Sequence, residues 1–185
     1  MKFAHECGQE NPYWDFKHLY LDIFDDTEVE VHYHVEVLLN LYKNHKLQRW
    51  FEAHTDESLG HTDCADLTEK RELVTPTVEF NMFYILLHIY RHFIYEGVGL
   101  RQLMDYYFVL RQKNEVGMRS EESGEKIVVT DVLKHLGMMR FARGVMWVMQ
   151  EVFALDKKYM YCEPFESEGR FILSEVLTGG NFGWY

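Results

Sequence analysis

The chain has 185 residues, of which 47% are hydrophobic and 16% aromatic, so it holds enough apolar material to build a folded core. Acidic side chains outnumber basic ones by 30 to 19, which leaves a net charge of −11. That charge disfavours a nucleic-acid backbone as the main partner, because such binding needs a basic surface. The three cysteines are widely spaced and form no CxxC pair, a pattern typical of reduced thiols in the cytosol.

Neither a secretory signal nor a membrane span is visible in the sequence. Polar His5, Glu6 and Gln9 stand where a signal peptide needs an apolar run. Polar side chains also interrupt the most apolar stretch, residues 78–95, before it reaches the ~20 apolar residues of a membrane helix. We therefore expect a cytoplasmic protein that does not bind a membrane.

Residues 17–36 predict an antiparallel β-hairpin, the only β structure that we expect. Apolar and polar residues alternate over 19–23, and after an acidic turn at 25–27 they alternate again over 29–35. The polar face of the second strand carries Glu28, Glu30, His32, His34 and Glu36. This row is either the solvated face of a half-covered sheet or a set of carboxylates and imidazoles that binds a metal or a substrate.

Helical periodicity accounts for most of the remaining chain. Thr75 is expected to cap a central helix with Pro76 in its first turn, and residues 54–73 and 112–126 are expected to be long loops. Helices are predicted at 37–52, 78–95, 100–111, 132–136, 138–155 and 170–177.

The predicted fold is therefore α+β and mainly α. It is a helical bundle in which a central helical hairpin, Val78–Arg111, covers one small antiparallel β-hairpin. We expect two parts, the β-hairpin in residues 1–36 and a single compact helical domain in residues 37–185.

The central helix has a thin polar side. At about 100° per residue, Asn81, His88, Arg91 and His92 share it. His88 and His92 have the HxxxH spacing that allows two imidazoles to bind one metal ion, although the glutamate of HExxH is missing. The competing interpretation is a structural pair of histidines with backbone or carboxylate partners.

Arg101 and Asp105 lie four residues apart on the helix that follows the Gly97 and Gly99 turn. That spacing predicts an ion pair that fixes the angle of the helical hairpin. The pair would lie either on the surface or within the polar side around His88 and His92.

Several common catalytic motifs are absent, including GxGxxG, the P-loop and GxSxG. Three other runs occur in a definite order. They are EVEVHY at 28–33, the pair His88 and His92 followed by GLRQLMD at 99–105, and GGNFG at 179–183. In this order and spacing they resemble the uncharacterised bacterial nucleotidyltransferase family of the polymerase-β-like superfamily, over nearly the whole chain but only as the C-terminal half of such a protein.

The resemblance implies transfer of a nucleotidyl group from a nucleoside triphosphate to an unknown acceptor. Members are thought to bind Mg²⁺ through two acids of a Gly-Asp-x-Asp motif and a third acid on a later strand. The third acid matches Glu30, which would be both a metal ligand and a catalytic residue, with His32 beside it as the second catalytic residue. The residues that would bind the substrate are His88, His92, Arg101 and Asp105. Residues 1–36 would be the remnant of the nucleotidyltransferase sheet.

The Gly-Asp-x-Asp motif itself does not occur in these residues. One carboxylate cannot hold two Mg²⁺ ions, so we expect a truncated member that is inactive alone. Two alternatives stay open. One is a non-catalytic helical module, or the complementing half of a split enzyme, that binds a partner protein or a second copy through the edge of the β-hairpin. The other is a metal-binding protein that uses His32 with His34, or His88 with His92.

Overall fold

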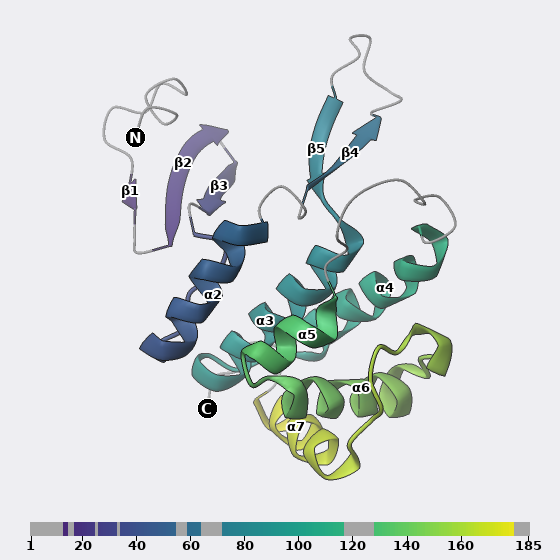
Figure 1. The fold of residues 1–185 in the computed structure, drawn as a ribbon. Helices are drawn as coiled ribbons and strands as arrows, with labels where there is room; N and C mark the ends of the chain where they lie inside the picture. Colours follow the sequence, from purple (N-terminus) through teal and green to yellow (C-terminus); the bar gives the residue numbers. More distant parts are fainter. Residues whose placement is uncertain are drawn as a thin grey trace. The chain divides into compact units, whose positions relative to one another are not determined.

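The computed structural model describes residues 13–14, 17–24, 26–32, 34–54, 59–63, 72–116 and 128–179 (Figure 1). It is mainly helical with a small three-stranded antiparallel sheet, which confirms the predicted fold class. The chain divides into two compact units, Met1–Phe51 and Glu52–Tyr185. The division after residue 36 stays a prediction. Among the described helices, none is long and apolar enough to cross a lipid bilayer.

The sheet of the first unit consists of β1 (Tyr13–Trp14), β2 (His18–Phe24) and β3 (Thr27–His32), in that order. Cross-strand pairing places Leu19 opposite Val31 and Leu21 opposite Val29. These four apolar residues pack on one face, because alternate residues of a strand point the same way. The predicted hairpin is therefore present, and its opposite face carries the polar residues.

The predicted polar row is shorter than expected, because β3 ends at His32 and Glu36 turns inward. Glu36 and Lys17 are both fully buried, and their Oε1 and Nζ atoms lie 2.8 Å apart. The Val37 amide also donates to the Glu36 carboxylate at 2.9 Å. Strand alternation extended the row too far because it does not report where a strand leaves the sheet.

Helix α2 (Leu41–His54) follows the sheet and begins four residues later than predicted. The Asn40 side chain accepts a hydrogen bond from the Lys43 amide at 3.0 Å, which satisfies one of the unpaired donors of the first turn. Leu47 and Phe51 form the buried face of the helix.

The second unit contains a strand pair that we did not predict, β4 (Leu59–Asp63) and β5 (Glu72–Pro76), which are antiparallel (Figure 1). The expectation of a loop over 54–73 was wrong for these residues. The run LGHTD in β4 has no apolar alternation, so its strand conformation depends on backbone pairing with β5. Pro76 ends β5, and Thr77 caps the next helix by accepting from the Phe80 amide at 3.2 Å, in place of the predicted Thr75.

The helices of this unit surround an apolar core. The break between the first two falls at residues 96–99, as predicted, and Gly97 adopts a φ of 87° that favours glycine. The elements are α3 (Val78–Tyr95), α4 (Leu100–Val116), α5 (Val129–His135), α6 (Met139–Phe153), the 3-10 turn η2 (Lys157–Tyr159) and α7 (Glu166–Gly179).

Two of these helices begin three or four residues earlier than predicted. Helix α5 begins at Val129 and α7 at Glu166, whereas we expected residues 132 and 170. Helix α5 has no side-chain cap, so no capping residue marks its start in the sequence.

Helix α4 buries a tyrosine in the core. Tyr106 is fully buried, whereas Met104 remains 43% exposed. The Tyr106 hydroxyl shares a hydrogen bond of 2.8 Å with the Tyr161 hydroxyl. Burial raises the pKa of both hydroxyls, so both remain protonated.

Candidate functional site

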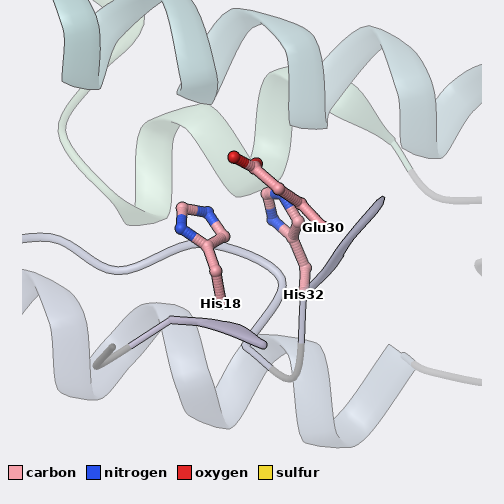
Figure 2. A group of neighbouring side chains, drawn as sticks. All are labelled: His18, Glu30 and His32. Carbon is pink, nitrogen blue, oxygen red and sulfur yellow. The ribbon is translucent and has the colours of Figure 1, made fainter. Parts of the chain in front are cut away.

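Three potential metal ligands converge on the polar face of the sheet (Figure 2). His18 of β2 lies directly opposite His32 of β3 in the antiparallel register. Glu30 precedes His32 by two residues, so both project from the same face of β3. One ligand atom from each of the three side chains lies within 4.8 Å of the other two.

We call His18, Glu30 and His32 the sheet triad. Their side chains leave a space between them. The two imidazole ring centroids are 4.3 Å apart, and His32 Nε2 lies 4.0 Å from Glu30 Oε2. The neighbouring ligand atoms of a tetrahedral zinc site are about 3.4 Å apart, given Zn–N and Zn–O bonds near 2.1 Å. Small side-chain rotations would therefore bring the three atoms onto one ion.

A neighbouring tyrosine orients one of the imidazoles. The Tyr20 hydroxyl lies 3.3 Å from His18 Nδ1, and in the tautomer whose Nδ1–H donates to that hydroxyl, Nε2 carries the lone pair that would bind the ion. The Tyr20 ring in turn contacts Tyr13 of β1, with ring centroids 5.2 Å apart. A hydrogen bond to the second ring nitrogen is the usual way in which proteins hold a metal-binding histidine.

The electrostatic surroundings favour the neutral form of His32. Partial burial lowers the pKa of its imidazole, and the positive charges of Lys17 and His18 lower it further, while Glu30 and Glu36 oppose that shift. Neutral imidazole is the form that binds metals. The site is accessible, since the Glu30 side chain is 47% exposed and the His32 side chain 31% exposed.

The donor set is chemically selective. Two imidazoles and one carboxylate suit Zn²⁺, Fe²⁺ and related ions, and they leave coordination positions for water or substrate. Mg²⁺ prefers oxygen ligands in octahedral geometry. Glu30 fits Mg²⁺ as a single oxygen ligand, whereas the two imidazoles do not, so the Mg²⁺ that the resemblance implies stays a prediction.

Sequence reasoning identified Glu30 and His32 but missed His18. The alternation over 19–23 leaves His18 at a polar position, but symmetric pairing about the acidic turn at 25–27 would place residue 18 opposite residue 34. His18 lies opposite His32 because the register shifts between Leu21 and Phe24, and the sequence carried no signal for that shift. His34, which we considered as the partner of His32, is exposed in a bend beyond the end of β3.

The other predicted site residues lie in the second unit, where α3 brings two of them together. His88 Nε2 and His92 Nε2 are 3.0 Å apart. Glu96 and Arg91 extend this group. The Glu96 carboxylate contacts His92 Nδ1 and Arg91 Nη2, each at 2.8 Å. Sequence reasoning had not paired these two residues in the site.

Arg101 and Asp105 are both exposed on α4. Within the described part of the chain, no ion pair joins them. An exposed pair at this spacing contributes a few tenths of a kcal/mol at most, so any role in substrate binding would depend on their charges at the surface.

Cys162 lies beside a pocket of about 340 Å³ that follows η2 and is lined by Lys157, Met160, Tyr161, Glu163 and Pro164. Burial raises the pKa of its thiol to about 11; Arg143 opposes this shift and Glu163 adds to it. A raised pKa keeps the thiol protonated, and only the thiolate is nucleophilic. Cys162 is therefore not a candidate nucleophile at neutral pH.

We expect Cys162 to react with iodoacetamide at pH 8 about a hundredfold more slowly in the folded protein than in urea, because each pKa unit changes the thiolate fraction tenfold. The rate in the folded protein should rise about tenfold per pH unit between pH 7 and 9. Mass spectrometry of the peptide that contains Cys162 measures both rates. Equal rates in the folded and unfolded chain at pH 8 would contradict the raised pKa.

Comparison with known proteins yields no relative for this chain. No family model matches it, and neither a curated protein nor a solved structure matches it. The functional argument therefore depends on the geometry of these side chains.

Proposed function

We propose that this chain binds one divalent transition-metal ion of the Zn²⁺ class through His18, Glu30 and His32. The observation that carries the proposal is the convergence of one ligand atom from each of these residues within 4.8 Å. Two neighbouring strands supply the ligands, so the backbone hydrogen bonds of the sheet hold them in place before an ion arrives.

The number of ligands favours a reactive site over a structural one. Structural zinc sites are closed by four protein ligands, whereas catalytic sites have three and keep a position open. The exposure of Glu30 and His32 gives a substrate access to that position. When bound, the ion would act as a Lewis acid toward a phosphate or carbonyl oxygen.

A second candidate function follows from the family resemblance, and the position of Glu30 favours it. The carboxylate that the resemblance assigns to metal binding is the carboxylate of the sheet triad. We propose that the chain is the C-terminal part of a nucleotidyltransferase and that another polypeptide would supply the missing acids. On this proposal, the chain alone does not transfer nucleotides.

The metal proposal is tested by titrating the protein with Zn²⁺ in a calorimeter and with Co²⁺ by visible absorption. His32→Ala should abolish one equivalent of binding. Loss of a metal ligand lowers the affinity by more than the 10–100-fold that is lost with an outer-shell partner. His34→Ala is the matched control, since this exposed histidine lies two residues beyond the site. If His34→Ala lowers binding as much as His32→Ala, or if Glu30→Gln leaves it unchanged, the proposed site is wrong.

The transferase proposal is tested by incubating the chain with each nucleoside triphosphate and Mg²⁺ or Mn²⁺. We expect no pyrophosphate release by the chain alone. We expect release when the polypeptide encoded immediately upstream is supplied, and Glu30→Gln should abolish it. Release by this chain alone would show that the missing acids are not needed, and no release from the combined polypeptides would rule out the transferase.

A further inference from the structure

The histidine pair of α3 has the features of a second metal site. His88 and His92 are four residues apart, so their side chains lie one turn apart on the same helix face. Their Nε2 atoms point toward each other at 3.0 Å, and both residues are partly exposed. We propose that His88 and His92 together chelate a divalent transition-metal ion, with Glu96 orienting His92 from the outer shell.

The spacing of the two nitrogen atoms fits one ion between them. Two metal–nitrogen bonds of about 2.05 Å to atoms 3.0 Å apart enclose an angle of about 94° at the metal. This angle is close to the right angle between neighbouring ligands of a tetragonal Cu²⁺ or Ni²⁺ site. It is also within reach of tetrahedral Zn²⁺ after a small opening of the pair. The chelate therefore needs no rearrangement of the helix.

The outer shell selects the correct form of His92. Its Nδ1 lies 2.8 Å from Glu96 Oε2, so in the neutral imidazole Nδ1–H donates a hydrogen bond to that carboxylate and Nε2 carries the lone pair. Arg91 Nη2 contacts Glu96 Oε1 at 2.8 Å, which holds the carboxylate in place. Carboxylate–histidine–metal arrangements of this kind fix the ring and strengthen the ligand.

The ring of His88 is also constrained. It stacks on Tyr84 with centroids 6.0 Å apart and an interplanar angle of 29°, and it meets the His92 ring edge-on at 4.3 Å. In the tautomer in which His92 Nδ1–H donates to Glu96, His88 Nε2–H is the donor to His92 Nε2. An ion would replace this hydrogen bond, and His88 would bind as the tautomer protonated at Nδ1.

This site is independent of the proposed function, because the sheet triad belongs to the other unit of the chain. The inference is therefore tested in a His32→Ala background, from which the sheet site is removed. Titration with Zn²⁺ by calorimetry and with Cu²⁺ by electron paramagnetic resonance should show one remaining equivalent. The Cu²⁺ spectrum should show hyperfine coupling to two nitrogen atoms.

Three further variants in this background decide the outcome. His88→Ala should abolish the remaining equivalent, and Glu96→Gln should weaken it by about 10–100-fold without removing a ligand. His135→Ala is the control, because this exposed histidine at the end of α5 should not affect binding. Glu96 is 44% exposed, so its substitution leaves the core intact and remains informative if His88→Ala does not fold.

Two results would overturn the inference. One is a His32→Ala protein that binds no ion, in which case His88 and His92 form only a hydrogen-bonded pair. The other is binding that survives His88→Ala or is unchanged by Glu96→Gln, in which case the ion lies elsewhere.

Discussion

Gly169→Ala should lower the free energy of unfolding of the second unit, Glu52–Tyr185, by about 1–3 kcal/mol, the range of forced overpacking. Helices α6 and α7 approach closely at two glycines. A Cβ on Gly169 would lie 2.7 Å from Trp147 Cβ, and a Cβ on Gly144 would lie 2.7 Å from Glu168 Cγ. The first of these neighbours is fixed to the backbone of α6, so the helices would have to separate.

The prediction is checked by urea unfolding, with tryptophan fluorescence and far-UV circular dichroism as two probes of the same transition. Gly179→Ala is the matched control, because a Cβ at that position meets nothing within 4 Å and should leave the midpoint unchanged. If Gly169→Ala and Gly179→Ala unfold at the same urea concentration, the close contact of α6 with α7 is wrong.

Lys17→Met should lower the free energy of unfolding of the first unit, Met1–Phe51, by about 3–5 kcal/mol. This is the cost of leaving a buried charge without its partner. Lys17 and Glu36 have no exposed side-chain surface, and their charged atoms are 2.8 Å apart. Methionine has a similar length but no charge, so the Glu36 carboxylate would remain buried beside an apolar chain. The Gln48 amide, which donates to the Glu36 carbonyl at 2.8 Å, would be disturbed with it.

Hydrogen exchange followed by mass spectrometry measures this effect within the first unit, with a chelator present so that metal binding does not contribute. Exchange of the β2, β3 and α2 amides should accelerate in Lys17→Met. The double variant Lys17→Met/Glu36→Leu should recover most of the protection, because an apolar pair removes both charges. A double variant as labile as the single one would show that the ion pair is not the source of the stability.

The sequence alone predicted the features that depend on one element at a time. Helical spacing identified α3 and placed His88 and His92 on one face, and the glycines at 97 and 99 marked the break before α4. Alternation identified β2 and β3 and placed Glu30 and His32 on the same side. These predictions succeed because the period of a helix or a strand determines which neighbours in sequence share a face.

The tertiary structure decided the contacts between elements. His18 joins Glu30 and His32 only through the register of β2 against β3. Lys17 finds Glu36 only after β3 ends and the chain turns inward, and Gly169 is required only where α7 meets Trp147. Periodicity contains no information on register or on the distance between packed helices, because both are set by the summed packing of residues far apart in the chain.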